Sequence, residues 1–188
     1  MKMKTNTASK AETPAVRQRI LDTAARLFHR QGYNSTGINQ LIEEAGVAKA
    51  SLYQHFKTKD DILKAYLMET SQAWFEQVDK TIQGQYTTKE KVLALFDMLG
   101  DFATSVDFRG CNFQNALVEL DINETDTRQF IQGHKSRMGQ VFADLLSSAE
   151  PDVANEVTLL FEGALITSQL FHNLEPIKTA RRIVERIL

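Results

Sequence analysis

The stretch from Thr36 to Asp61, TGINQLIEEAGVAKASLYQHFKTKDD, constrains the fold of this chain more than any other. Before Gly46, apolar residues recur at helical spacing, which predicts a short helix with one apolar face. Gly46 lacks a Cβ and suits the left-handed conformation in which many helices end. Leu52 and Phe56 lie four residues apart, so a second helix would bury them on one side. Two short helices joined by a turn of about three to four residues with a glycine form a helix-turn-helix.

The second of these helices, residues 49 to 56, presents a polar surface on its other side. It offers a cation, a hydroxyl, an amide and an imidazole beside small residues that permit close approach. Such groups read base edges and bind phosphates in a DNA groove. We expect the DNA contacts of this helix to come from Lys49, Ala50, Ser51, Tyr53, Gln54 and His55.

The residues AGVAKASLYQHFKTKDDIL, preceded by an amphipathic helix that ends in QGY, resemble the DNA-binding domain of the TetR family of transcriptional regulators. The resemblance covers roughly residues 14 to 65. One difference is Ala48, where such proteins often carry Ser, so the next helix lacks its expected side-chain N-cap, at a cost of about 1 kcal/mol. The matching residues are Phe28, Gly32, Tyr33, Thr36, Ala45, Gly46, Val47, Leu52, Tyr53, Gln54, His55, Phe56 and Lys59.

The resemblance implies a homodimer that binds a pseudo-palindromic operator in double-stranded DNA, with its two recognition helices about 34 to 36 Å apart. It further implies a repressor whose small-molecule effector binds the C-terminal domain and lowers operator affinity. The effector would stabilise a conformation in which the fourth helices hold the recognition helices at the wrong separation. A coupling free energy of about 1 to 3 kcal/mol would suffice.

Composition and charge agree with such a protein. The 188 residues are 43% apolar and 24% charged, as in an ordinary globular chain. Residues 1–60 carry ten basic and five acidic residues, a net charge of +5, so the rest carries -7 of the total of -2. An acidic remainder would orient the basic end toward DNA. One cysteine, no apolar run of about 18 residues and no apolar leader predict a cytoplasmic protein without membrane spans or intrachain disulfides.

Helical periodicity without strand alternation predicts an all-α fold. Residues 1–13 are polar and predict a disordered basic tail. Residues 14–60 predict the helix-turn-helix DNA-binding domain, and residues 61–188 the effector-binding and dimerisation domain.

Capping residues locate several helix ends. Thr13 and Pro14 are expected to start the first helix, and Gly32 to end it. Thr58 and Asp61 resemble the two halves of a capping box at the start of a long helix that runs to about residue 84 and could act as a lever. Further helices are expected over about residues 88–103, from 111 or 112 onward, 130–145, 152–172 (opened by Pro151) and 176–187.

The segment from residue 159 to 171 is apolar almost all round, so its helix must be covered on two sides. Small residues would allow close approach, and the amphipathic C-terminal helix could complete a four-helix contact with a symmetry mate. The alternative is a monomer with this helix as its central core. The expected dimer residues are Leu160, Gly163, Ala164, Thr167, Phe171, Ile183 and Ile187.

Within the DNA-binding motif, Tyr53 and Lys59 best fit phosphate contacts, because they would hold the backbone without reading sequence. Thr36 is expected to be the N-cap of its helix, and this helix start, with Gly37, is expected to meet a phosphate. The residues left open between base edges and flanking phosphates are Lys49, Ser51, Gln54 and His55.

The effector site is less determined by the sequence, because aromatic residues at helical spacing usually form a core. His134 and Asn115 interrupt apolar stripes and need polar partners if they are buried. Cys111 follows Arg109, and helix amides with a nearby cation would favour a reactive thiolate, the alternative being an inert buried thiol. The residues expected to line a pocket among the helices between residues 58 and 145, or to face it, are Trp74, Phe96, Phe108, Cys111, Asn115, His134, Met138 and Phe161.

Other classes of function find little support in the sequence. Cys111 and His134 lack an orienting third group and an oxyanion hole, so an enzyme is not expected. The four histidines are scattered without metal-ligand spacing, and no glycine-rich phosphate loop occurs, so neither a metal nor a cofactor is expected. One rival to an effector-released repressor is a ligand-independent DNA-binding or partner-docking protein with a solid C-terminal core. The other is a thiol- or redox-sensing regulator that acts through Cys111.

Overall fold

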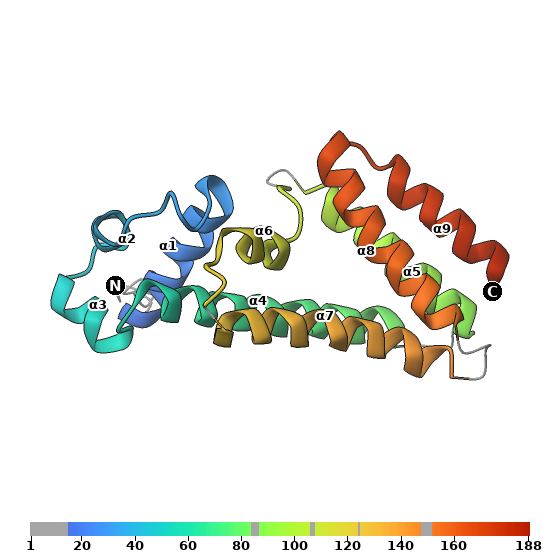
Figure 1. The fold of residues 1–188 in the computed structure, drawn as a ribbon, viewed down its shortest axis with the longest axis horizontal. Helices are drawn as coiled ribbons and strands as arrows, with labels where there is room; N and C mark the ends of the chain where they lie inside the picture. Colours follow the sequence, from blue (N-terminus) through green and yellow to red (C-terminus); the bar gives the residue numbers. More distant parts are fainter. Residues whose placement is uncertain (1–14, 84–86, 106–107, 124, 148–151) are drawn as a thin grey trace, which may run out of the picture.

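The computed structural model describes residues 15–83, 87–105, 108–123, 125–147 and 152–188. Within them the regular secondary structure is helical, which confirms the all-α prediction (Figure 1). The basic tail, the helix start at Thr13 and Pro14, and Pro151 lie outside the described residues. The helices are α1 (Val16–Gln31), α2 (Ile38–Glu44), α3 (Lys49–His55), α4 (Lys59–Ile82), α5 (Thr88–Ala103), α6 (Asn112–Glu119), α7 (Thr125–Leu145), α8 (Val153–Phe171) and α9 (Glu175–Ile187).

Two glycines and one threonine define the ends of the first helices. Gly32 follows α1 with φ of 91°, and Gly46 follows α2 with φ of 62°, so both turns use backbone conformations that favour glycine. The hydroxyl of Thr58 accepts a hydrogen bond from the Asp61 amide at 3.0 Å, and the Asp61 carboxylate accepts one from the Thr58 amide at 2.9 Å. The predicted capping box is therefore present. α3 has no side-chain cap, as Ala48 led us to expect.

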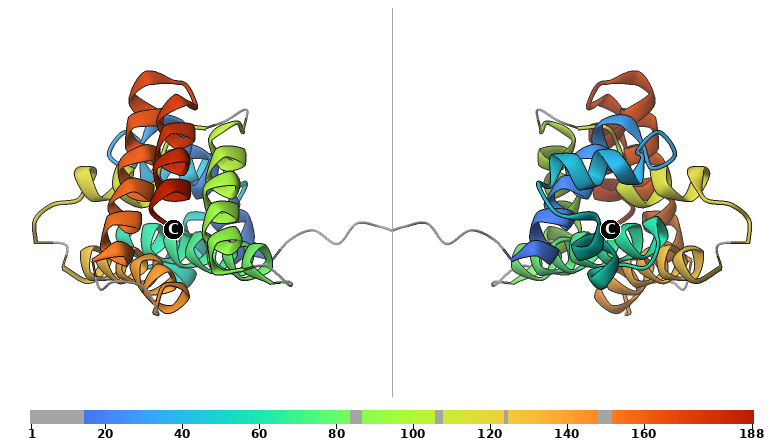
Figure 2. Two further views of the ribbon diagram at one scale, coloured as in Figure 1. Left: turned by 90° about the vertical axis from the view of Figure 1, so that its right-hand side faces the viewer. Right: turned by 90° about the vertical axis from the view of Figure 1, so that its left-hand side faces the viewer.

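The long helices α4 and α7 lie side by side along the molecule, with α1, α2 and α3 at one end (Figure 1). α5, α8 and α9 pack together on one side of this pair at the other end (Figure 2). The short α6 lies between the two groups. No helix in the part of the chain that the structure describes is long and apolar enough to cross a membrane.

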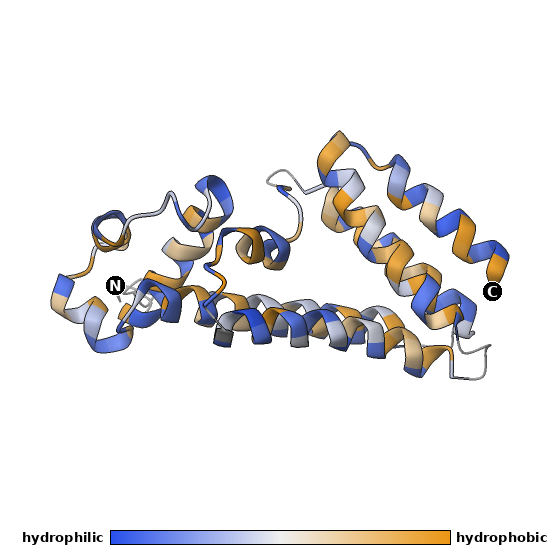
Figure 3. Ribbon diagram, in the orientation of Figure 1, coloured by the Kyte–Doolittle hydropathy of each residue, from blue (hydrophilic) through white to orange (hydrophobic). Residues whose placement is uncertain are grey.

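The core of the C-terminal helices is built around three phenylalanines. The ring centroids of Phe96 and Phe161, and of Phe142 and Phe161, are each 5.3 Å apart and pack edge to face. Each of these side chains is at most 2% exposed. Apolar turns of α8 pack against this core, while others remain on the surface (Figure 3). The C-terminal helices thus share one buried core.

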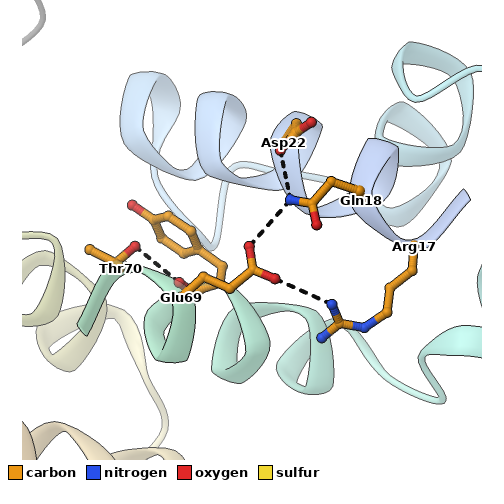
Figure 4. Close-up of polar contacts among 6 residues, drawn as sticks. Arg17, Gln18, Asp22, Glu69 and Thr70 are labelled. Atoms are coloured by element: carbon orange, nitrogen blue, oxygen red, sulfur yellow. Dashed lines mark hydrogen bonds and ion pairs between the residues drawn. The ribbon is translucent and has the colours of Figure 1, made fainter. Parts of the chain in front are cut away.

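Polar contacts attach α1 to α4 across the surface of the N-terminal domain (Figure 4). The Glu69 carboxylate accepts a hydrogen bond from Arg17 at 3.2 Å and one from Gln18 at 3.4 Å. Beneath them the rings of Phe28 and Tyr66 pack with centroids 6.1 Å apart. The first half of α4 therefore packs against α1 of the N-terminal domain, and its second half packs among the C-terminal helices. This continuity is what the lever hypothesis requires.

Candidate DNA-binding surface and effector pocket

The surface of α3 carries the side chains that the sequence predicts for DNA. Leu52 is fully buried, whereas Lys49, Ala50, Gln54 and His55 are exposed, Tyr53 is 42% exposed and Ser51 is half-buried. None of the polar side chains among them forms a hydrogen bond or ion pair with a residue that the structure describes. Donors without internal partners on an exposed face are available to phosphates and base edges.

Thr36 is placed differently from the prediction. It is fully buried, and its hydroxyl donates a hydrogen bond to the Gly32 carbonyl at 2.7 Å. The N-cap of α2 is Gly37, which has no side chain to cap with and is exposed. The N-cap assignment of Thr36 is wrong, because its hydroxyl holds the turn after α1 and is not offered to a phosphate.

The side chain of Lys59 forms internal contacts that the sequence did not predict. Its ammonium donates hydrogen bonds to the carbonyls of Tyr33 at 2.9 Å and Thr36 at 3.1 Å, and lies 4.1 Å from the centroid of the Tyr33 ring. Burial lowers the pKa of Lys59, and the nearby Glu119 carboxylate partly opposes this shift. This geometry makes Lys59 an internal link between the start of α4 and the α1–α2 turn and leaves one ammonium N–H for a phosphate, so the phosphate contact stays a prediction.

A cavity of about 550 Å³ lies among α4, α5, α6, α7 and α8. Its size is typical of small-molecule sites. Trp74, Cys111, His134, Met138 and Phe161 line it, as the sequence predicts. The sequence predicted Phe161 as a lining residue but did not predict that its helix, α8, forms a wall of the pocket. α8 also contributes Glu162 and Leu165 to this wall. The other lining residues are Thr70, Ala73, Gln77, Thr81, Ala94, Asp97, Met98, Asp101, Phe102, Asn112, Phe113 and Lys135.

Three predicted lining residues lie elsewhere. Phe96 is fully buried between Phe142 and Phe161, so it belongs to the core. Phe108 packs edge to face on the outer side of Phe102 and faces a second hollow, between α1, α6 and α8. Asn115 faces that same hollow. Its amide group donates a hydrogen bond to the Arg109 carbonyl, so its polar need is met outside the cavity.

The cavity wall contains an ion pair that the sequence did not predict. Lys135 of α7 and Glu162 of α8 are 2.6 Å apart, with side chains 25% and 22% exposed. Burial opposes the charged form of Lys135, but Cys111 and Glu162 outweigh it and raise the pKa of Lys135. Cys111 is 6% exposed and contributes to the raised pKa of this ammonium. Arg109, the cation expected beside the thiol, instead binds backbone carbonyls of α1.

His134 has the polar partner that its burial requires. Its Nδ1 forms a hydrogen bond of 2.8 Å with the Ser71 hydroxyl, and its ring stacks on Phe113 with centroids 3.5 Å apart. Burial lowers the pKa of His134 to about 4, and the charges of Lys135 and Arg137 add to the effect. The imidazole is therefore neutral at physiological pH.

α6 connects the cavity to the DNA-binding domain through its last residue. The Glu119 carboxylate accepts a hydrogen bond from the Asn34 amide at 2.6 Å, and the Glu119 carbonyl accepts one from the Asn34 side chain at 3.0 Å. A Cβ on Gly32 would lie 2.7 Å from the same carboxylate, so glycine permits this close approach. The carboxylate thus holds the turn between α1 and α2.

The other end of α6 holds the end of α1. His29 Nδ1 donates a hydrogen bond to the Asn112 side-chain oxygen at 3.0 Å, and Asn112 also lines the cavity. Arg109, just before α6, donates to the carbonyls of His29, at 2.8 Å, and Arg30. We call these contacts, together with those of Glu119, the α6 clasp. One wall of the cavity is therefore bonded directly to the DNA-binding domain.

The expected dimer residues gather on α8 and α9. A surface groove of about 480 Å³ runs between these helices and contains each of them except Ile187, which is 41% exposed at the end of α9. Ala164 is only 5% exposed at its floor. α8 exposes apolar side chains both in the groove, namely Leu159 (73%) and Phe171 (63%), and outside it, namely Ile166 (42%) and Leu170 (69%). Exposed apolar surface of this extent is typical of a protein interface.

Comparisons with known proteins agree with this geometry. Residues 20–66 match the family described as bacterial regulatory proteins, tetR family. The HTH-type transcriptional regulator LmrA of Bacillus subtilis is 25% identical over 169 residues, or 86% of this chain and 90% of LmrA. The fatty acid metabolism regulator protein of the same species is 31% identical over 140 residues, or 70% and 68% of the two chains. A TetR-family regulator from Streptomyces coelicolor shares 27% identity and a TM-score of 0.79, with 90% and 96% of the chains covered.

The internal role of Lys59 can be tested by replacing it with glutamine. Loss of the ammonium leaves two carbonyls without their donor, so Lys59→Gln should lower the free energy of unfolding by about 1 to 3 kcal/mol. The slope of log affinity for DNA against log salt should stay unchanged. A fall of that slope by about one, with stability intact, would support the phosphate assignment. Tyr53→Phe is the contrast: stability should hold, and affinity should fall about tenfold on operator and random DNA alike.

The buried neutral imidazole predicts a pH dependence of stability. The unfolded chain binds a proton at His134 near pH 6.5, whereas the folded chain does so only near pH 4, so the free energy of unfolding should fall as pH drops through this window. The loss attributable to His134 is at most about 3.5 kcal/mol, at about 1.4 kcal/mol per pKa unit. Denaturant titrations at several pH values measure it. His134→Gln should flatten the profile between pH 6.5 and 4, and an unchanged profile would contradict the assignment.

Proposed function

The chain belongs to the TetR family of bacterial transcriptional regulators, and on that basis we propose that it is a cytoplasmic homodimeric repressor that a small-molecule effector releases from a pseudo-palindromic operator. The observation that carries this proposal is the position of α6, which forms part of the cavity wall and is hydrogen bonded to the DNA-binding domain at both of its ends. A ligand that displaces this wall must also affect the turn and helix that the clasp holds.

DNA binding is assigned to the exposed face of α3. Lys49, Gln54 and His55 lie on it without partners among the residues that the structure describes, and Tyr53 presents its phenol from the same helix. We assign the phenol to a phosphate and leave Lys49, Ser51, Gln54 and His55 between base edges and flanking phosphates, with Ala50 and Gly37 allowing close approach. The Thr36 hydroxyl and two N–H groups of the Lys59 ammonium are engaged by backbone carbonyls, so we give these two side chains less weight as DNA contacts.

Dimerisation is assigned to α8 and α9. Gly163 is exposed between apolar neighbours on α8, so a partner helix could approach closely there. A symmetric contact through the groove would use the same residues on both subunits and bury the exposed apolar side chains. Such a dimer presents two α3 helices, as a two-half-site operator requires.

The effector mechanism is a population shift. An effector that binds best to a protomer with a displaced α6 favours that state in proportion to its differential affinity. Residues of α4 between Thr70 and Thr81 line the cavity, and Glu69 of the same helix is hydrogen bonded to α1. A change in the cavity can therefore reach the DNA-binding domain through α4 as well as through α6. The described cavity argues against the rival with a solid C-terminal core.

Salt dependence and footprinting test the DNA assignment. Purified protein should protect one palindromic site upstream of its own gene, because regulators of this kind commonly act on nearby promoters. Affinity should fall by about 10³ to 10⁵ between about 50 and 200 mM salt if the dimer makes about 6 to 10 phosphate contacts. A flat salt response would contradict docking of two α3 helices against DNA.

The α6 clasp provides the test of effector coupling. A compound that shifts the emission of Trp74 by entering the cavity should weaken operator binding about 5- to 150-fold. Glu119→Gln should reduce that factor while the compound still shifts Trp74 emission, because the carboxylate that holds Asn34 is lost. Glu76→Gln is the control, since Glu76 is exposed on α4 and bonds only to Gln72 among the described residues.

A second outcome addresses the thiol alternative. Cys111→Ser should respond to the same compound as the original protein if release is noncovalent. Loss of the response in Cys111→Ser would instead favour a regulator that senses reactive compounds through this thiol, which lines the same cavity as Lys135. A compound that occupies the cavity and leaves operator affinity unchanged would contradict effector release altogether.

A further inference from the structure

We propose that the effector is an amphipathic organic cation whose apolar or aromatic body fills the cavity and whose positive charge lies beside Asp101. This inference rests on the proposed function, because it names the chemical class that the effector site selects. It follows from the charges of the lining residues and from the faces of the aromatic side chains among them.

The charged groups on the wall do not balance. Of the lining residues that the structure describes, Asp97, Asp101 and Glu162 are acidic and Lys135 is basic. Lys135 and Glu162 neutralise each other at 2.6 Å. An uncompensated negative charge is therefore left on α5, where Asp97 and Asp101 are four residues apart and face the same cavity.

The two aspartates of α5 differ in how they are held. Arg181 of α9 binds both carboxylate oxygens of Asp97, at 2.6 and 3.1 Å, so this charge is already paired. Asp101 is exposed and its carboxylate forms no hydrogen bond or ion pair with a residue that the structure describes. Asp101 is thus the acidic group of the cavity that a ligand can pair with at no cost to an internal contact.

The basic groups near the cavity do not offer the same to an anion. An anion that bound Lys135 would have to displace or crowd the Glu162 carboxylate, which lies on the same wall. His134 is neutral because burial lowers its pKa to about 4. Charge complementarity therefore favours a cation over an anion of the same shape.

The aromatic lining suits the body of such a ligand. Trp74 of α4 and Phe102 of α5 pack edge to face with centroids 5.6 Å apart, and both line the cavity beside Asp101. A positive charge near the face of an aromatic ring is attracted by its quadrupole, by about 0.5 to 1 kcal/mol at exposed sites. Deeper in, Met98, Met138 and Leu165 provide an adaptable apolar surface.

Three probes that share one skeleton separate charge from shape. We would compare 6-phenylhexyltrimethylammonium, 6-phenylhexanol and 6-phenylhexanesulfonate by isothermal titration calorimetry. Emission of Trp74, the one tryptophan of the chain, is the second readout. The cation should bind at least about fivefold more tightly than the alcohol, and the sulfonate most weakly. The advantage of the cation should shrink as salt is added.

Asp101→Asn is the decisive variant. It should weaken binding of the cation about two- to fivefold, or about 0.4 to 1 kcal/mol, which lies within the range of exposed ion pairs, and leave binding of the alcohol unchanged. Asp79→Asn is the matched control: Asp79 is an exposed aspartate of α4 outside the cavity lining, so the same loss of charge should change neither affinity. Circular dichroism melting would verify that both variants are folded.

The outcomes distinguish this inference from the function on which it rests. Equal or tighter binding of the alcohol or the sulfonate overturns the cationic class, as does an Asp101→Asn variant that binds the cation as before. Binding by none of the three probes overturns it as well. In each of these cases effector release stands or falls separately, by whether any compound that shifts Trp74 emission releases the operator.

Discussion

In the mechanism that we propose, the coupling of the two halves of this protein depends on the α6 clasp. α6 has only eight residues, and its ends meet different parts of the DNA-binding domain. Asn112 reaches the end of α1, and Glu119 reaches Asn34 in the turn before α2. Because the same short helix lines the cavity and bonds to the DNA-binding domain, a ligand whose affinity differs between two positions of α6 would regulate DNA binding in the proposed mechanism.

The DNA-binding domain uses some of its polar residues internally and leaves others free. Thr36 and Lys59 bind backbone carbonyls around the α1–α2 turn, where unpaired carbonyls would be costly. Lys59 thereby fastens the start of α4 to that turn. The side chains of α3 have no such duties among the described residues. Most of the residues that we assign to DNA are therefore distinct from those that order the domain.

The cavity combines an apolar interior with a small number of charges, most of which are already paired. Lys135 and Glu162 join α7 to α8, and Arg181 and Asp97 join α9 to α5. These pairs fix the walls and leave Asp101 as the carboxylate without a protein partner among the described residues. The cavity shares α6 with the clasp and α8 with the surface that we assign to the dimer. A displacement of either helix is therefore expected to change the cavity and one of the two contact surfaces together.

Local chemistry in the sequence was sufficient for the elements of the fold. Turn glycines and capping boxes depend only on the conformations of neighbouring residues, so they can be predicted without knowledge of the tertiary structure. The examples here are Gly32, Gly46 and the capping box of Thr58 and Asp61. Apolar spacing located the helices for the same reason, and placed Leu52 inside and the polar side chains of α3 outside. The family resemblance rested on this same local pattern.

Tertiary structure alone decided which polar groups face one another across distant parts of the chain. The sequence predicts a phosphate contact for Lys59, whereas the structure places its ammonium against the carbonyls of Tyr33 and Thr36, more than twenty residues earlier in the chain. The pairing of Lys135 with Glu162 and the outward position of Asn115 likewise depend on how helices cross, which periodicity does not specify. Helical spacing determines the face on which a side chain lies, whereas the partner on that face is determined by packing.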